Sequence, residues 1–531
     1  MKRWNGWGDD AIDYPLPEQA KRLLEQAVGA GSAPRDATLE ELVATVPSSR
    51  LPAHPLISQD PIARARHSRG QSLPDWIALR SAQVDMFPDG VASPTSNDDI
   101  RSLLNFARSA GARLIPYGGG TSVVGHINSA HGDAPVITVD MGRMRALLRF
   151  DATSQLATFG AGITGPDLEA HVRASGYTLG HFPQSFEYST LGGWIATRSS
   201  GQQSLGYGRI EQLFAGGRLE APAGTLVLPA FSASAAGPDL REMILGSEGR
   251  MGILTEATVR VTALPKREEV HTVFFPDWEQ ALLAARQIIQ SQAPLSLLRL
   301  STPVETATTL AMAGHTRAIG ALERLLALRG VGNDKCILMM GCTGTTALVT
   351  MVRKAALQIA TQHGGVHVGR AIGRQWLKNR FRTPYLRNSL WESGYALDTL
   401  ETASNWADVP ALLAAIEESL RNGLADCGER VFVFSHLSHL YPTGSSIYTT
   451  YLYRIAPDPQ ETLRRWNKLK AAASLAIIAR GGTISHQHGV GVDHRPYLPA
   501  EKGKLGMNAI QTLCANFDPD GLMNPGKLYQ R

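Results

Sequence analysis

Apolar residues along this chain recur with two periods, about 3.6 residues as in a helix and two residues as in a strand. From residue 90 onward the pattern predicts a helix over 97–110, followed by strands over 112–116 and 135–140. A strand over 154–159 and a helix over 167–175 come next. Short helices and strands therefore alternate in this part, and another strand over 252–261 closes it.

Beyond Pro265 the predicted units become larger. Strands are expected over 270–275, 296–301, 336–341, 431–438 and 446–454. Helices are expected over 278–291, 346–363, 409–425 and 459–480. Repeated β-α-β units with antiparallel strand pairs predict a sheet that helices cover on one face.

These patterns predict an α+β protein with four parts. Residues 1–89 form an irregular and helical N-terminal region, and residues 90–265 form a two-lobed domain. Residues 266–490 form a cap domain, and residues 491–531 return to the two-lobed domain. A chain of 531 residues is too long for one ordinary core, so a ligand has room between the domains.

Composition narrows the class of protein. With 43% hydrophobic and 19% charged residues the chain is globular, and its net charge of +5 is spread without a basic stripe, so we expect no nucleic-acid partner. The polar start around Trp4 and Trp7 does not read as a signal peptide. The apolar run 471–479 is too short to span a bilayer, which leaves only peripheral membrane contact. The scattered cysteines fit a reducing, cytoplasmic setting: Cys336, Cys342, Cys427 and Cys514.

A glycine-rich loop directly follows the strand predicted over 112–116. It reads Pro116, Tyr117, Gly118, Gly119, Gly120, Thr121 and Ser122. Three glycines let consecutive backbone N–H groups approach a phosphate, and the two hydroxyls add donors, so the loop is a candidate diphosphate cradle. An ordinary tight turn is the alternative. The spacing G-x-G-x-x-G is absent, which disfavours a Rossmann site for NAD.

Two more segments suit a flat aromatic ligand. Residues 180–212 mix glycine, serine and threonine with aromatic residues and lack periodicity, so they could wrap a ring and its polar edges. Residues 246–253 place Gly246-Ser-Glu-Gly249 just before a strand. A mobile surface loop and a surface hairpin are the respective alternatives.

In their order and spacing these motifs resemble the FAD module of the vanillyl-alcohol oxidase/PCMH superfamily. With the N-terminal Trp4-Asn-Gly-Trp-Gly8, the chain is similar to the alkyldihydroxyacetonephosphate synthases over nearly its whole length. The resemblance implies a PCMH-type two-lobed FAD-binding domain and a ferredoxin-like cap. Besides the glycine loop, it implies FAD contacts at Gln184, Ser185, Ser189, Thr190, Gly193, Thr197, Ser200, Gly201, Tyr207, Ile210, Glu248, Gly249 and Ile253. The attachment histidine of some relatives is replaced by Thr121 and Ser122, so noncovalent FAD is expected.

The resemblance also implies a reaction. Those synthases exchange the acyl group of an acyl-dihydroxyacetone phosphate for a fatty alcohol through an adduct at flavin N5, without net redox change. By resemblance Arg387 binds the anionic group of the substrate, with Arg299 and His436 as further substrate contacts, and Tyr448 is the acid/base. The family's three-histidine run becomes His486, Gln487 and His488 here, and we assign the two histidines to catalysis.

Two departures from the family pattern stand out. The first is Gln487, which replaces the central histidine of the family's run. On a strand, His486 and His488 would share a face and Gln487 would point away. The second departure concerns His436. His436 stands where the family has an arginine. His436 and His439 could join the other histidines around a metal, but metal-dependent relatives carry a glutamate where Gln487 stands, so we expect no metal.

Two alternatives to alkyl transfer stay open. One is an FAD-linked dehydrogenase or oxidase of a 2-hydroxy acid, with Arg387 binding the carboxylate. The other is a non-catalytic flavin-binding module, which leaves the likeness of the cap domain unexplained. For either enzyme we expect a small lipid or organic-acid substrate and a homodimer.

Overall fold

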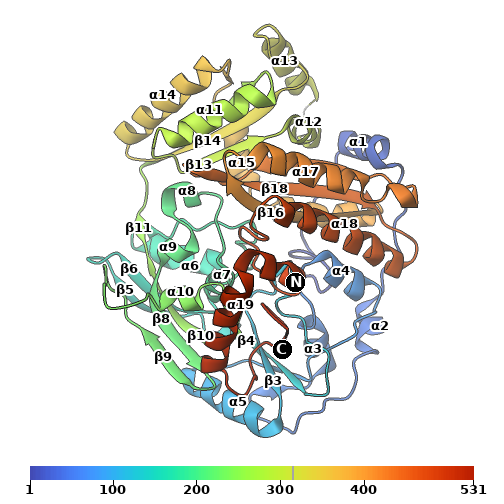
Figure 1. Ribbon diagram of the computed structural model, residues 1–531, viewed down its shortest axis with the longest axis vertical. Helices are drawn as coiled ribbons and strands as arrows, with labels where there is room; N and C mark the ends of the chain where they lie inside the picture. Colours follow the sequence, from blue (N-terminus) through green and yellow to red (C-terminus); the bar gives the residue numbers. More distant parts are fainter. Residues whose placement is uncertain (314–315, 531) are drawn as a thin grey trace.

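The lower half of the molecule holds two small sheets (Figure 1). The computed structural model describes residues 1–313 and 316–530. In the first sheet, of order β1-β2-β4-β3, the strands β2 and β3 run parallel to β4, and β1 is antiparallel to β2. Their bounds are β1 Ile57–Ser58, β2 Gly90–Ala92, β3 Arg113–Tyr117 and β4 Val136–Asp140.

The second sheet of this half has five antiparallel strands in the order β5-β6-β10-β8-β9. Their bounds are β5 Leu147–Asp151, β6 Leu156–Gly160, β8 Phe214–Ala221, β9 Gly224–Leu228 and β10 Ile253–Arg260. In β10 buried and half-buried residues alternate, because one face of the strand packs against the core. A two-stranded pair joins β7 Tyr177–Thr178 to β11 Thr262–Ala263.

The upper half is built on one antiparallel sheet of seven strands, in the order β15-β12-β14-β13-β17-β18-β16. Their bounds are β12 Arg267–Phe275, β13 Leu297–Ser301, β14 Cys336–Gly344, β15 Val366–His367, β16 Tyr395–Asn405, β17 Phe432–Leu437 and β18 Gly444–Arg454. Four long helices cover one face of this sheet (Figure 1). They are α11 Trp278–Gln290, α14 Thr346–Gln362, α17 Val409–Asn422 and α18 Pro459–Ala479.

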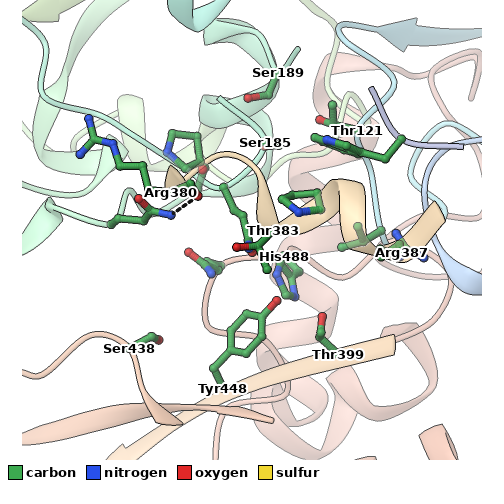
Figure 2. Close-up of a pocket in the computed structure, with 18 of the residues that line it drawn as sticks. Thr121, Ser185, Ser189, Arg380, Thr383, Arg387, Thr399, Ser438, Tyr448 and His488 are labelled. Atoms are coloured by element: carbon green, nitrogen blue, oxygen red, sulfur yellow. Dashed lines mark hydrogen bonds between the residues drawn. The ribbon is translucent and has the colours of Figure 1, made fainter. Parts of the chain in front are cut away.

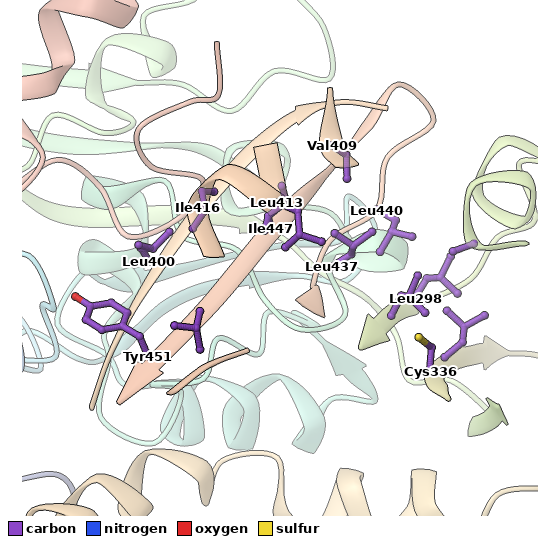
Figure 3. Close-up of a cluster of buried hydrophobic side chains, with 14 of the residues drawn as sticks. Leu298, Cys336, Leu400, Val409, Leu413, Ile416, Leu437, Leu440, Ile447 and Tyr451 are labelled. Atoms are coloured by element: carbon purple, nitrogen blue, oxygen red, sulfur yellow. The ribbon is translucent and has the colours of Figure 1, made fainter. Parts of the chain in front are cut away.

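Alternation along these strands separates a core face from a cavity face. Leu298, Ile447 and Tyr451 point toward the helices and join one large buried cluster (Figure 3). Arg299 and Tyr448, one residue removed, line a cavity on the opposite face. Because successive side chains of a strand point to opposite faces, the cavity-lining residues and the core residues alternate along these strands.

The remaining helices connect these sheets. They are α1 Glu18–Val28, α2 Leu39–Val43, α3 Pro61–Arg66, α4 Leu73–Arg80, α5 Asn97–Ala110, α6 Gly165–Ala174, α7 Leu191–Thr197, α8 Ser204–Tyr207, α9 Ile210–Leu213, α10 Arg241–Ile244, α12 Pro303–Met312, α13 Thr316–Ala327, α15 Ala371–Asn379, α16 Leu386–Glu392 and α19 Leu498–Phe517. No helix in the described part of the chain has both the length and the apolar character needed to cross a membrane.

The expected α+β fold with an antiparallel cap sheet is confirmed, and most predicted elements lie within a few residues of the observed ones. α5 has the predicted bounds because its ends are marked: Ser96 accepts a hydrogen bond from the Asp99 N–H, and Gly111 ends the helix in the left-handed conformation. The sequence patterns missed several elements, among them β5, β8, β9, β16, α12, α13, α16 and α19. The four-part division of the chain stays a prediction.

The C-terminal segment packs against the lower half. Leu522 O accepts from the Leu114 N–H, and Asn524 N–H donates to Leu114 O, so the segment runs beside β3. Arg250 is buried and donates to Met523 O and to the Tyr529 hydroxyl. The C-terminal segment therefore lies beside β3, the strand that leads into the glycine-rich loop at 116–122.

Candidate active site

A cavity of about 1180 Å³ lies between the lower half and the cavity face of the cap sheet. One wall is the glycine loop at Pro116–Ser122 with residues 183–202, and the opposite wall comes from β13, β17 and β18. Figure 2 shows Thr121, Ser185 and Ser189 on the first wall and Tyr448 rising from the sheet toward His488.

Two glycine contacts join the two FAD-type motifs. A Cβ on Gly118 would lie 2.2 Å from Thr190 Oγ1, and one on Gly119 would lie 1.7 Å from Tyr188 O. Any other residue at these positions would therefore drive the loops apart. Glycine is needed here for close approach between segments some 70 positions apart, as well as for the turn itself.

Most of the predicted cofactor residues line this cavity. They are Pro116, Tyr117, Gly118, Gly119, Gly120, Thr121, Ser122, Gln184, Ser185, Ser189, Thr190, Gly193, Thr197, Ser200, Glu248, Gly249 and Ile253. Gly201, Tyr207 and Ile210 lie outside its wall. The Gly201 carbonyl accepts from His439, the Tyr207 ring lies against Gly180, and Ile210 belongs to the core of the lower half.

The cavity fits FAD. Its size, the phosphate-type glycine loop and a wall of small hydroxylic residues suit a long ligand that is anionic in its middle and flat at one end. Ser200 Oγ is buried without a hydrogen-bond partner, which leaves it available to a bound group. The residues that would hold the cofactor are thus those of the glycine loop, of 184–200 and of 248–253.

Arg387 carries an unused donor at the cavity wall. On α16, its Nη1 donates to Gln71 O at 2.7 Å, and its guanidinium carbon lies 4.3 Å from the centre of the Trp76 ring. Nη2 is buried without a partner. Burial lowers the pKa of this arginine from its usual value, and a bound anion would offset that cost.

Tyr448 occupies the centre of the cavity face. It is paired across strands with His436 on β17 and Glu401 on β16, and the edge of its ring faces His488 with centroids 6.1 Å apart. Burial raises the pKa of Tyr448 to about 12, against the lowering effects of Thr399 and Arg387. The phenol is therefore neutral at pH 7 and is a hydrogen-bond donor before any substrate proton moves.

Arg299, His436 and Glu305 form a buried charged group beside Tyr448. Glu305 Oε1 lies 2.6 Å from Arg299 Nη2 and 2.9 Å from His436 Nδ1. Burial alone would raise the pKa of Glu305, but His436 and Arg299 outweigh it and hold that pKa at about 2. Glu305, on α12, was not among the predicted site residues, since no motif surrounds it.

Residues 485–491 do not form the strand on which His486 and His488 would share a face. The segment bends instead, so the predicted alternation of faces does not apply. Gln487 and His488 both line the cavity, whereas His486 lies outside its wall. Gln487 Nε2 donates to Glu401 Oε2, and His486 Nδ1 lies 3.1 Å from Glu401 Oε1, so both residues converge on one carboxylate.

Among the described residues, one cluster brings together three groups that could ligate a metal: Glu401, His439 and His486. Hydrogen bonds account for this cluster as well. Arg209 can only donate, so its contact of 2.7 Å with His486 Nε2 assigns that atom the lone pair and leaves the proton on Nδ1, facing Glu401. Ser438 and Gln487 also donate to Glu401. A metal-free site remains our prediction.

Two cations near the cavity were missed. Arg380 lines the wall (Figure 2). Its guanidinium carbon lies 4.3 Å from the centre of the Phe182 ring, and its Nη1 donates to Gln203 Oε1. Arg209 lies within the segment Tyr207–Ile210 and holds His486. Arg209 could have been predicted as a site residue, because it is a charged residue inside a motif rich in glycine and aromatic residues. No sequence motif marks Arg380 in this way.

Comparisons with known proteins agree with this geometry. A family model described as FAD binding domain matches residues 88–228, and one described as FAD linked oxidases, C-terminal domain, matches residues 264–528. Alkyldihydroxyacetonephosphate synthase of Dictyostelium discoideum is 29% identical, over 99% of this chain and 93% of its own length. A solved alkyldihydroxyacetonephosphate synthase structure superposes with a TM-score of 0.84, at 27% identity, over 98% of both chains.

A mitochondrial D-lactate dehydrogenase of Arabidopsis thaliana is 26% identical over 83% of this chain and 73% of its own length. The fold, the cavity and both family matches define the chain as a two-domain, FAD-dependent enzyme. Within that class, full-length similarity and fold identify it as an alkyldihydroxyacetonephosphate synthase-like flavoprotein.

Proposed function

We propose that this enzyme exchanges the acyl group of an acyl-dihydroxyacetone phosphate for a fatty alcohol, as an alkylglycerone-phosphate synthase does. One observation carries the proposal: the same cavity joins the spare donor of Arg387 and the Tyr448 phenol to a compartment of apolar side chains. Six of these are Leu16, Leu24, Leu310, Trp376, Phe434 and Leu452. An anion site continuous with an apolar compartment suits a substrate that has a phosphate at one end and a fatty chain at the other.

Each residue of the cavity has its own role in the proposed reaction. FAD held by the glycine loop and by residues 184–200 and 248–253 would supply an electron-accepting ring for the exchange of the acid for the alcohol. Arg387 binds the phosphate through Nη2, which fixes the anionic end of the substrate at the part of the cavity wall formed by α16. Tyr448 exchanges a proton with the substrate carbon, with His488 beside its ring. Arg299 and His436 contact the substrate and keep Glu305 ionised.

Gln487 gives the cavity a neutral group where a titratable one would otherwise stand. Because its Nε2 donates to Glu401, its side-chain oxygen is free to accept a hydrogen bond. A fatty alcohol or a substrate hydroxyl can donate to that oxygen. His486 supports this arrangement from outside the wall, through its contact with Glu401.

We also propose a cytoplasmic setting for the enzyme, with peripheral membrane contact. Cys336, Cys342 and Cys427 are free cysteines, which agrees with a reducing cytoplasm. Peripheral contact with a membrane would deliver fatty substrates to the apolar compartment. Homodimer formation stays a prediction that light scattering on the purified protein tests.

The experiment that tests the function uses no electron acceptor. Purified holoenzyme is mixed anaerobically with palmitoyl-dihydroxyacetone phosphate and labelled hexadecanol. We expect labelled alkyl-dihydroxyacetone phosphate and free palmitate in equal amounts, with the flavin oxidised at the end. Absence of labelled ether product from an FAD-loaded enzyme would contradict the proposal.

A second candidate is a 2-hydroxy-acid dehydrogenase, because Arg387 Nη2 would bind a carboxylate as well as a phosphate. The two functions differ in net redox. A 2-hydroxy acid such as D-lactate would bleach the flavin anaerobically and leave it reduced if this candidate is right. An unchanged flavin spectrum with a panel of 2-hydroxy acids removes it.

A further inference from the structure

The N-terminal motif Trp4-Asn-Gly-Trp-Gly8 lies against α16, the helix that carries Arg387. Asn388 makes a reciprocal pair with the backbone of Trp7: its Nδ2 donates to Trp7 O at 3.0 Å, and its Oδ1 accepts from the Trp7 N–H at 3.1 Å. Asn388 and Trp7 are both buried. The residue next to Arg387 is thus tied to a segment some 380 positions earlier in the chain.

The two glycines of the motif permit this approach. Gly8 has φ +83°, and a Cβ there would lie 2.2 Å from Tyr385 Cε1. A Cβ on Gly6 would lie 2.6 Å from Asn388 Oδ1. The motif thus needs glycine because Tyr385 and Asn388, which flank Arg387 in sequence, press against its backbone.

Residues 4–8 make further contacts on both sides of Arg387, with Gln71 and with Tyr188. Gln71 Nε2 donates to Gly6 O at 3.3 Å, and Gln71 O accepts from Arg387 Nη1 at 2.7 Å. On the cofactor side, the Trp7 ring meets the Tyr188 ring edge-on at 5.7 Å, and the Tyr188 hydroxyl lies 3.1 Å from that of Tyr385. The backbone of the motif therefore contacts the side chains of Tyr385 and Asn388, on either side of Arg387, and reaches the guanidinium through Gln71.

We propose that residues 4–8 position Arg387, so that Nη2 stays aimed at the anionic group of the substrate. The proposal rests on the anion-binding role given to Arg387 above. Residues 4–8 themselves are positioning residues, since they act through Asn388, Tyr385 and Gln71. The burial of Nη2 makes the position of Arg387 depend on its neighbours, because a buried guanidinium nitrogen has few alternative partners.

The experiment compares two variants with two matched controls in FAD-loaded full-length enzyme. Gly8→Ala places a methyl group against Tyr385, whereas Gly29→Ala introduces the same kind of strain, at φ +92°, with no atom nearer than 3.6 Å. Asn388→Ala removes the pair with Trp7. Ser389→Ala removes a neighbouring bond of the same helix, to Tyr14 O at 2.7 Å, which lies outside the motif.

We expect Gly8→Ala and Asn388→Ala to raise KM for the acyl-dihydroxyacetone phosphate about 10-fold or more, with kcat changed far less, since a shifted binding group weakens substrate binding. FAD content should match the parent in all four variants, and both controls should keep the parent KM. Unchanged KM in Asn388→Ala, or equal KM changes in variants and controls, would overturn the proposal.

Failure of the proposed function is distinguishable from failure of this inference. If the parent enzyme does not catalyse the exchange, the function fails, and a crystal structure of Asn388→Ala decides the positioning role alone. Displacement of the Arg387 guanidinium from Gln71 O supports the inference. An Arg387 side chain that keeps this bond in the variant overturns it.

Discussion

The imidazole of His436 stacks on the phenol ring of Tyr448, with ring centroids 4.9 Å apart and planes inclined by 18°. The two residues are direct cross-strand partners on β17 and β18. His436 stands where the family pattern has an arginine, yet Arg299 reaches within 3.2 Å of its Nδ1 from β13. A guanidinium is therefore present beside the tyrosine, supplied by a different strand.

Tyr448→Phe should lower turnover by about 10²–10⁴-fold, as expected when a general acid/base is lost. Folding and FAD content should stay near those of the parent, because only one oxygen is removed from a ring that keeps its stacking on His436. Steady-state exchange kinetics and the flavin spectrum measure the two effects.

Tyr451→Phe is the matched control for that variant. Tyr451 is fully buried on the core face of β18, where its hydroxyl donates to Asp398 Oδ2 at 3.1 Å. We expect near-parent turnover and a stability loss of about 1 kcal/mol for the lost hydrogen bond. A larger loss of turnover in Tyr451→Phe than in Tyr448→Phe would refute the assignment of the acid/base.

Arg387→Lys should retain FAD and bind substrate more weakly. A lysine ammonium cannot both donate to Gln71 O and present a second, fixed donor to an anion, as the planar guanidinium does. We expect KM to rise by at least 10-fold, about 1.4 kcal/mol of binding free energy. Kinetics on the exchange reaction test this, and a parent-like KM would remove Arg387 from the substrate site.

Asp493→Asn should raise the melting temperature more at pH 8 than at pH 5. Burial raises the pKa of Asp493 to about 7, against the lowering effect of Lys470, and Oδ2 has no hydrogen-bond partner. An unfolded aspartate titrates near pH 4. Between these pH values the folded state binds more protons, so its stability falls as pH rises toward 7. The amide removes that loss.

Thermal unfolding of parent and Asp493→Asn holoenzymes at both pH values measures this difference. Asp133→Asn, at an exposed aspartate, is the control and should change neither melting temperature. An equal gain at pH 5 and pH 8 would show that the carboxyl is not titrating in this range.

Acid precipitation should release the FAD into a yellow supernatant. Thr121 and Ser122 stand in the glycine loop where some relatives attach the flavin through histidine, so noncovalent binding is expected. The flavin absorbance of the supernatant and of the pellet checks this. Yellow colour that stays with the precipitated protein would show a covalent link.

Several parts of the fold and site followed from local sequence. α5 was predicted because its cap residues and apolar period are short-range signals. The glycine loop and the stretch around Ser189 and Thr190 were assigned to one cofactor, and they do line one cavity. β16 was missed: its residues are buried on both faces in places, so no clean alternation marks it.

By itself the sequence determined the two-part α+β architecture, the FAD-type loops and the placement of Tyr448 and Arg387 among the chemistry-bearing residues. Only the tertiary structure decided that His486 and Gln487 both contact Glu401 and that Arg299 lies beside His436. It also decided that residues 4–8 contact the helix of Arg387. The physical reason is range: caps, turns and periodicity act over a few residues, whereas these contacts join segments that meet only once the sheets have packed.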